Sequence, residues 1–340
     1  MTKIVEKYFT QNDFSKREEE VLGKVTQQTG FEPKELIFKG TIYDPDKVGS
    51  IIYRGIYQDK DAVLKLQGLQ PEIDEPDIIE NFKAQNLSKR IRLPELFGWQ
   101  KWNEKMGYGW LITEFIDAPK IFEKPFATPS QMDLFCNFYQ EYRANSLNKA
   151  WLKKDEEGAA DFIIRRVEIW RNISDHKAIL RERISSEKTK ERIERYKKIM
   201  RRELSEIEMV FCHGHLTAED ILIEENGNFV LLSNLYWTYR PELYDLVFNV
   251  WGCMQHIKDP NFDYGQLKSF FDEWFKRYYQ ILVVATDLDA KRKINLMLLE
   301  RMMGAILIDT GSRPIGKDEK ATRNLLSLQA RFFDEISEKF

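Results

Sequence analysis

The sequence predicts an α+β protein with two lobes, a small strand-rich lobe followed by a larger, mainly helical one. The length of 340 residues is enough for two domains of roughly 150 residues each. Stretches that alternate apolar and polar residues, which are typical of strands, are concentrated before Pro119. After Pro119, apolar residues at helical spacing dominate. We therefore place the first lobe at residues 1–117 and the second at residues 118–340.

The composition excludes several classes of protein. Hydrophobic residues make up 43% of the chain and charged residues 31%, as in ordinary globular proteins. The 52 basic and 55 acidic residues nearly balance, so neither nucleic acid nor an anionic membrane is an expected partner. No apolar run approaches the roughly 18 residues of a membrane span, and the charged N-terminus lacks the core of a signal peptide. With three widely spaced cysteines, these features predict a cytoplasmic protein.

The first lobe is predicted to contain strands around one helix. Three alternating stretches, LIFKGTIY, SIIYRGIY and AVLKLQ, lie between residues 35 and 66 and are separated by the turn formers DPDKVG and QDKD. A helix is expected at 77–86, with Pro76 suited to its first turn and an apolar face formed by Ile78, Ile79 and Phe82. Another strand pair follows at PELFGWQKW and GYGWLITEF.

The second lobe is predicted to be helical apart from one hairpin at 211–235, where ENGN is a turn signal. Aromatic residues in FFDEWFKRYYQ recur at i, i+3, i+4 and i+7, which favours a core-facing helix over an aromatic box for a quaternary ammonium ligand. These residues are Phe271, Trp274, Phe275 and Tyr278. Better candidates for ligand contacts follow the hairpin, at Tyr236, Trp237 and Tyr239.

Two charged residues of the first lobe have the residue types that phosphoryl transfer requires. Lys65 lies on a predicted strand, and Glu80 lies on the helix that follows. Taken singly, each is typical of a solvated surface. Phosphoryl transfer, however, needs a cation to hold the nucleotide phosphates and a carboxylate to fix that cation.

The segment His213–Leu222, HGHLTAEDIL, resembles the catalytic loop of the aminoglycoside phosphotransferase and choline kinase family, which reads roughly His-Gly-Asp-Leu-His-Pro-Gly-Asn-Ile-Leu. LSNL at 232–235 takes the place of the family's Ile-Asp-Trp-Glu, and YDL at 244–246 that of its Tyr-Asp-Leu. RLPELFGW and LITEFIDAP also match segments of the family at the right separations. The resemblance covers residues 37 to 250. It implies a protein-kinase-like fold that binds ATP, Mg²⁺ and a small hydroxyl-bearing molecule between its lobes.

On the nucleotide side, the resemblance implies that the phosphates are bound by Lys65 with Glu80. A sparse phosphate loop is offered by Gly49 and Ser50, with Gly55 in the strand that follows. The carbonyl of Glu114 and the amide of Ile116 match the backbone groups that such kinases offer to adenine. These last two assignments rest on position alone.

At the reaction centre, all three expected residues are replaced. The family's catalytic aspartate falls on His215, and its first magnesium-binding asparagine falls on Asp220. Its second magnesium-binding residue falls on Ser233, with Asn234 as a weak substitute, and a hydroxyl is a poor ligand for Mg²⁺. Two further residues that hold the loop in the family, His213 and Asp245, are kept.

We interpret the chain as a nucleotide-binding pseudokinase whose phosphoryl transfer is lost or strongly impaired. Two alternatives stay open. One is an active phosphotransferase with a rewired centre, in which His215 is the base and Asp220 binds metal. Its missing metal ligand would come from Glu219, Glu224 or Glu225. The other is a scaffold for a protein partner that binds no nucleotide.

Overall fold

The computed structural model describes most of the chain and divides it into two compact units. The described residues are 13–40, 48–71, 73–147, 150–154, 157–184, 186–205, 207–232, 236–282, 287–313 and 315–340. The first unit comprises residues 1–119 and 220–236, and the second comprises residues 120–219 and 237–340. The first boundary lies close to the one expected from the sequence. The assignment of 220–236 to the first unit was not expected.

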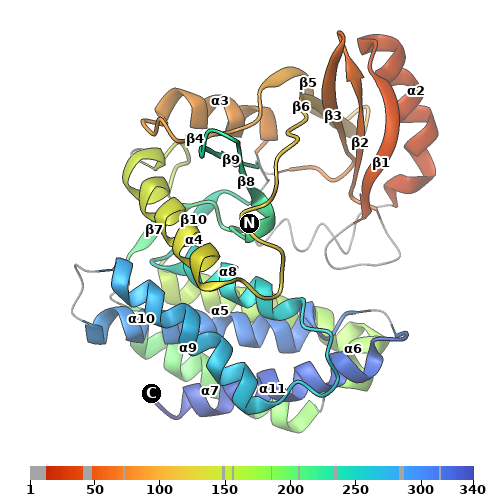
Figure 1. Ribbon diagram of the computed structural model, residues 1–340. Coiled ribbons are helices and arrows are strands. Elements are labelled where there is room, and N and C mark those ends of the chain that lie inside the picture. The colour runs from red at the N-terminus through yellow and green to blue at the C-terminus, as the bar shows by residue number, and fades with distance from the viewer. Residues whose placement is uncertain are drawn as a thin grey trace. The chain divides into compact units, whose positions relative to one another are not determined.

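Within its described residues, the first unit contains one five-stranded sheet, one three-stranded sheet and two α-helices, which are labelled α2 and α3 in Figure 1. Its elements are the 3₁₀ turn η1 (Phe14–Arg17), α2 (Glu18–Thr29), β1 (Glu32–Gly40), β2 (Ser50–Tyr57), β3 (Lys60–Gln67), α3 (Glu75–Gln85), β4 (Ile91–Arg92), β5 (Leu96–Asn103), β6 (Tyr108–Glu114), β8 (Ile221–Ile223) and β9 (Phe229–Leu231).

The larger sheet is antiparallel in the order β1-β2-β3-β6-β5. Helix α2 covers one face, where its Val21 and Val25 join a buried cluster with Leu64 and Leu66 of β3. Because side chains alternate along a strand, Lys65 points to the opposite face. The strands expected between 35 and 66 are therefore confirmed. Helix α2, which the sequence reading missed, has acidic residues in its first turn and Gly30 in the left-handed conformation at its C-cap.

The smaller sheet explains why residues 220–236 belong to the first unit. Strand β9 pairs in parallel with β4 and antiparallel with β8, in the order β4-β9-β8. The ENGN turn joins β8 to β9, and Gly227 adopts a φ of +79° there. The sequence predicts the whole hairpin 211–235 within the helical lobe. The structure separates it, because only β7 (Met209–Cys212) pairs within the second unit, with β10 (Thr238–Pro241).

The second unit is mainly helical, as the sequence predicts. Its remaining elements are α4 (Pro129–Glu141), the π-helical turn η2 (Tyr142–Ser146), α5 (Ala159–His176), α6 (Ala178–Arg183), α7 (Ser186–Glu203), α8 (Tyr244–Gln255), α9 (Tyr264–Ile281), α10 (Asp287–Gly304), the π-helical turn η4 (Ala305–Asp309) and α11 (Glu319–Ser337), with the 3₁₀ turn η3 (Ala218–Asp220) at the boundary. The aromatic stripe of α9 is buried along its whole length, which confirms a core-facing helix. No helix among the described residues is long and apolar enough to cross a membrane.

Candidate functional site

Lys65 forms a buried ion pair on the face of the sheet opposite α2. Its ammonium group lies 2.5 Å from the carboxylate of Glu75, at the N-terminus of α3, and the two side chains are only 17% and 8% exposed. In register, Lys65 lies between Ile52 of β2 and Leu111 of β6. A lysine on the third strand that pairs with a glutamate of the following helix is the arrangement by which protein kinases hold nucleotide phosphates.

The carboxylate that holds Lys65 is therefore Glu75, and the expected pairing with Glu80 is wrong. Five residues separate the two glutamates, and at about 100° per residue their side chains leave the helix in nearly opposite directions. Glu80 is exposed. The sequence did hold a signal for Glu75, since it lies three, four and seven residues before the buried Ile78, Ile79 and Phe82. The helix expected from the sequence begins at residue 77, so Glu75 lies outside it, whereas α3 begins at Glu75.

The expected phosphate loop is tied to the sheet at its C-terminal end. The N–H group of Gly49 donates to the carbonyl of Gly40 at 3.0 Å, and the carbonyl of Gly49 accepts from the N–H groups of Gly68 and Leu69. Ser50 is the first residue of β2, opposite Gln67. At Gly55, a Cβ atom would lie 2.1 Å from the carbonyl oxygen of Glu32, so this glycine lets β1 and β2 approach each other. Residues 41–47 lie outside the described part of the chain.

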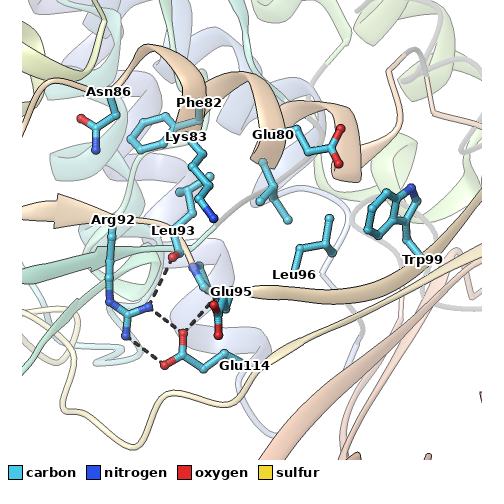
Figure 2. Close-up of a pocket in the computed structure, with 12 residues that line it drawn as sticks. Glu80, Phe82, Lys83, Asn86, Arg92, Leu93, Glu95, Leu96, Trp99 and Glu114 are labelled. Carbon is cyan, nitrogen blue, oxygen red and sulfur yellow. Dashed lines mark hydrogen bonds and ion pairs between the residues drawn. The ribbon is translucent and has the colours of Figure 1, made fainter.

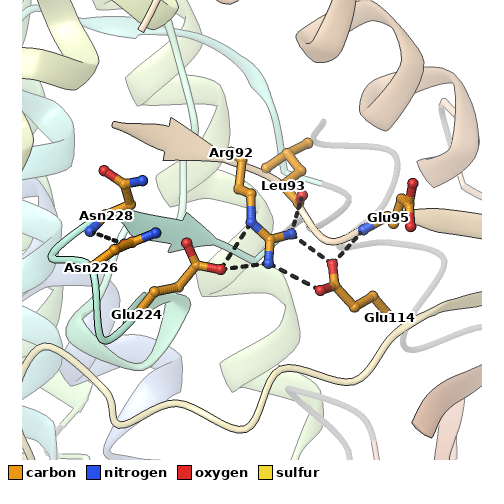
Figure 3. Close-up of polar contacts among 7 residues, drawn as sticks. All are labelled: Arg92, Leu93, Glu95, Glu114, Glu224, Asn226 and Asn228. Carbon is orange, nitrogen blue, oxygen red and sulfur yellow. Dashed lines mark hydrogen bonds and ion pairs between the residues drawn. The ribbon is translucent and has the colours of Figure 1, made fainter. Parts of the chain in front are cut away.

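At the end of β6, Glu114 belongs to a charged network (Figure 3). Arg92 donates two hydrogen bonds to its carboxylate, at 2.6 and 3.0 Å, and also contacts Glu224 at 2.6 Å. The same carboxylate accepts the N–H of Glu95 at 3.1 Å. Burial by itself would raise the pKa of Glu114, but the hydrogen bonds and charge of Arg92 outweigh it and lower the pKa. The network joins β4, β6 and the β8–β9 hairpin within the first unit.

This network lies beside a cavity of about 500 Å³ between α3 and the chain leading into β5 (Figure 2). Glu80 and Lys83 of α3 lie on one wall, and the exposed Trp99 lies at the edge. Glu80 is exposed because its side chain lines this cavity and does not pack against the sheet. Of the adenine-binding groups predicted from position, Glu114 pairs in register with Ala62 of β3, and the half-buried Ile116 follows in the segment after β6.

The backbone of the catalytic-loop segment is held by a buried carboxylate in the second unit. Asp245, 2% exposed at the start of α8, accepts the N–H of Gly214 at 2.9 Å and that of His213 at 3.1 Å. It also accepts the hydroxyl hydrogen of Tyr142 at 3.3 Å, and that hydroxyl in turn accepts the N–H of His213 at 2.7 Å. Burial raises the pKa of Tyr142 well above its usual value, and the charge of Asp245 adds to this effect.

The two histidines of this segment have different environments. His213 is fully buried, and its ring lies edge-on to Trp237 at 5.0 Å between centroids. His215 is half-buried, and its ring packs against Phe248 of α8 at 4.7 Å. Gly214, between them, has a φ of +73°, which a side chain would disfavour. The aromatic neighbour of His215 is an apolar surface, which suits an imidazole ring better than a carboxylate.

The residues expected to bind metal are only partly described. Asp220 is half-buried at the start of β8, and its carbonyl accepts the N–H of Leu232 at 2.7 Å. Ser233 and Asn234 lie outside the described residues. Within the residues that the structure does describe, no group of three or more His, Cys, Asp or Glu side chains lies close enough to hold a metal ion.

Two of the three candidates for a missing metal ligand are engaged in ion pairs. Glu224 binds Arg92, as described above, and Glu219 binds Lys124 at 2.9 Å. Although burial would raise the pKa of Glu219, the contact with Lys124 outweighs burial and lowers it. Glu225, the third candidate, is exposed in the turn between β8 and β9.

Of the three aromatic residues expected to contact a ligand, Trp237 and Tyr239 make structural contacts, and Tyr236 is half-buried. Trp237 is 2% exposed and packs against Phe211, Tyr142 and Trp151. The hydroxyl of Tyr239 donates to the carbonyl of Leu152 at 2.9 Å. These contacts anchor β10 and β7 in the second unit, so an interpretation of Trp237 as a ligand contact is wrong.

Comparison with solved structures identifies the fold. Spectinomycin phosphotransferase APH(9)-Ia, in complex with ADP and spectinomycin, matches with a TM-score of 0.56 and 15% identity over 94% of this chain and 96% of that one. A thermostable mutant of aminoglycoside phosphotransferase APH(4)-Ia matches with a TM-score of 0.56 and 10% identity over 93% and 97%. Plasmodium vivax ethanolamine kinase matches with a TM-score of 0.55 and 14% identity over 90% and 83%. The chain has the fold of these phosphotransferases.

The phosphotransferase fold confirms the α+β, kinase-like architecture that the sequence predicted. No protein-family model matches the sequence, and a search of curated proteins finds no match either. The likeness is therefore one of structure at low sequence identity. Chemistry at this site must be argued from the residues themselves.

Proposed function

We propose that the chain is a nucleotide-binding pseudokinase related to the aminoglycoside phosphotransferases and choline kinases, with phosphoryl transfer lost or strongly impaired. The observation that carries this proposal is the catalytic-loop segment. Its backbone is held by hydrogen bonds to Asp245, yet the residue in the place of the catalytic aspartate is His215, which packs on Phe248. A loop of this kind keeps its geometry without the carboxylate that orients the attacking hydroxyl.

The ion pair between Lys65 and Glu75 supports nucleotide binding. The ion pair with Glu75 holds the ammonium group of the half-buried Lys65 in one place, and a positioned cation of this kind is what nucleotide phosphates require. Solved structures that share the fold were obtained with ADP and with AMP-PNP, together with hygromycin B or spectinomycin. By analogy, a small hydroxyl-bearing molecule is the second ligand that we propose.

The engaged carboxylates weigh against an active enzyme with a rewired centre. Charge neutralisation by metal supplies much of the catalysis in phosphoryl transfer, so an active centre needs a second strong ligand besides Asp220. Glu219 and Glu224 would each have to leave an ion pair to serve, which leaves the exposed Glu225 as the candidate without such a cost. Such a change is costly when the abandoned partner is buried, as Lys124 is, with 5% of its side chain exposed.

Thermal unfolding with ATP, in the presence and absence of Mg²⁺, tests the proposal. A ligand at a hundred times its dissociation constant stabilises the folded state by about 2.7 kcal/mol. We expect ATP to raise the unfolding temperature without requiring Mg²⁺, and to do so less in Lys65→Ala. The matched control is Lys60→Ala, which removes an exposed lysine at the start of the same strand and should leave the ATP response unchanged.

Each other outcome has a meaning of its own. A shift that requires Mg²⁺, together with ADP release on a panel of small alcohols and aminoglycosides, would establish the active enzyme instead. The absence of any shift at saturating ATP would contradict nucleotide binding and favour a scaffold. An unchanged ATP response in Lys65→Ala would mean that ATP binds elsewhere on the protein, and an equal loss in Lys65→Ala and Lys60→Ala would contradict a specific role for Lys65.

A further inference from the structure

A second cavity, of about 510 Å³, lies in the second unit, where α8 ends and α11 begins (both helices are labelled in Figure 1). Its wall on the α8 side is formed by Gln255, His256 and Lys258. Its wall on the α11 side includes Lys317 and Thr322. None of these residues belongs to the catalytic-loop segment, although His256 lies close enough to Glu219 of that segment for the two charges to interact.

The N-terminus of α11 faces this cavity. The helix is 19 residues long, and its N-cap residue Asp318 makes no side-chain cap hydrogen bond. The N–H groups in the first turn of a helix lack intrahelical acceptors and carry partial positive charge, so they favour an anion. Ala321, in this first turn, lines the cavity.

Gln255 provides an independent observation. Its Nε2 atom is buried and has no hydrogen-bond partner among the described residues, and the residue lines the cavity. A buried donor without a partner is unfavourable, which is why such groups usually find an acceptor. This donor, and the hydroxyl of Thr322, which is only 3% exposed and also lines the cavity, are available to a ligand there.

The charged side chains around the cavity are mostly cationic. Arg313 is fixed in place by its contacts with the carbonyl and the Oε1 atom of Gln255. Lys258 and Lys317 add two ammonium groups, against a single lining carboxylate, Asp318, which lies 3.7 Å from Lys258. The potential in the cavity is therefore positive.

His256, on the cavity wall, has charged neighbours on several elements. Burial lowers the pKa of His256, and the charge of Lys124 lowers it further, while Glu219 opposes the shift. Arg313 and Lys258, both on the cavity wall, lower it as well. Cations on several elements thus act on the same region of space.

We propose that this cavity binds a phosphate group, held by the N-terminus of α11, the Thr322 hydroxyl and the side chains of Lys317 and Arg313. A tetrahedral dianion accepts several hydrogen bonds at once and suits a site with donors on different sides. The same group is carried by inorganic phosphate, by phosphorylated small molecules and by lipid headgroups. This proposal is independent of nucleotide binding at Lys65.

Isothermal titration calorimetry at constant ionic strength tests it on the full chain. The probes are inorganic phosphate, glycerol 3-phosphate, and phosphatidylcholine vesicles with and without phosphatidic acid. We expect binding of at least one probe, weakened about tenfold by Lys317→Ala and by Thr322→Val, since each variant removes a donor to a charged group. Thr322→Val keeps the shape of a buried side chain, and Lys317 is exposed, so both variants should fold.

The matched control is Lys320→Ala, which removes an exposed lysine of the same helix that does not line the cavity. Its affinity should stay within twofold of that of the unmodified protein. The probe that binds most tightly with this pattern identifies the source of the phosphate. The proposal is overturned if no probe binds, if neither Lys317→Ala nor Thr322→Val weakens binding, or if Lys320→Ala weakens it equally.

Discussion

The surroundings of Lys65 and those of His215 differ in what the fold preserves. Around Lys65, two charged side chains hold each other, and both are largely buried. Around His215, a buried carboxylate on α8 holds the backbone, and the side chains that would react are those that depart from the family pattern. Under the proposed function, the groups that hold this loop are distinct from the groups that would react in it. A chain can keep the first set after the second has changed.

The largest expected effect comes from restoring the reactive set. We expect His215→Asp combined with Ser233→Asp to raise ADP release with a small-alcohol and aminoglycoside panel at least about 10²-fold, because positioned acid–base catalysis commonly supplies 10²–10⁴-fold. A coupled spectrophotometric assay with ATP and Mg²⁺ measures this. His176→Asp, a change at an exposed histidine on α5, is the matched control.

Two results would contradict the interpretation that the loop keeps its geometry and lacks only its reactive residues. Equal activity in the unmodified protein would show that His215 already serves as a working base. No gain in the double variant, in a protein that still binds ATP, would show that the loop has lost its catalytic geometry along with its residues.

Removing the carboxylate that holds the loop should cost the most stability. Asp245→Ala leaves the N–H groups of His213 and Gly214 and the hydroxyl of Tyr142 without this acceptor. We expect a loss of about 3–5 kcal/mol in the free energy of unfolding, measured by urea denaturation, because each unsatisfied buried donor costs about 1–3 kcal/mol. Asp245→Asn, which keeps one acceptor oxygen, should lose less.

Asp272→Ala, at an exposed position on α9, serves as the control and should change stability by less than about 0.5 kcal/mol. If Asp245→Ala lost under about 1 kcal/mol of unfolding free energy, other contacts would hold the loop, and the contrast drawn at His215 between holding and reacting groups would fail.

The ion pair of the first unit gives the next largest effect. Glu75→Gln leaves Lys65 without its partner in a largely buried position, so we expect a loss of about 2 kcal/mol in unfolding free energy and weaker ATP binding. Glu80→Gln makes the same chemical change five residues later at an exposed site, and should alter neither quantity. Urea denaturation and ATP titration of both variants measure this. The opposite ranking would restore Glu80 as the partner of Lys65.

The sequence could predict β3 because one of its faces is buried, so the apolar period is visible in Ala62, Leu64 and Leu66. It could equally predict the buried face of α9. It could not place Glu75, because the choice between two glutamates depends on where α3 begins, and helix ends are the least certain part of a pattern. The sequence also could not predict that residues 220–236 belong to the first unit. That assignment depends on the pairing of β4 with β9, which involves only two residues of each strand.

The candidate site shows the same limit. The family pattern located His213, His215 and Asp245, because loop residues with fixed spacing are visible in sequence. It gave no sign that Glu219 and Glu224 are engaged, since their partners Lys124 and Arg92 are distant along the chain. Long-range ion pairs leave no local periodicity.

The smallest expected loss of stability is that of an Arg92 variant. Arg92, like Lys65, forms ion pairs in the first unit, but its side chain is more exposed. With 39% of the Arg92 side chain exposed, solvent screens its contacts, and we expect Arg92→Met to cost about 1 kcal/mol. Lys101→Met, at a more exposed pair with Asp77, should cost less than about 0.5 kcal/mol.

The pH dependence distinguishes this loss from one of packing. Folding lowers the pKa of Glu114 below its ordinary 4.5, because the contacts with Arg92 outweigh burial. A carboxylate with a lowered pKa in the folded state stabilises that state above its ordinary pKa, and the contribution disappears as the pH falls through the lowered value. The difference in unfolding free energy between the unmodified protein and Arg92→Met should therefore be full at neutral pH and shrink as the pH falls below 4.5. A difference independent of pH would assign the effect to the packing of the arginine side chain, and Arg92 would then contribute to the first unit through its apolar stem and not through its charge.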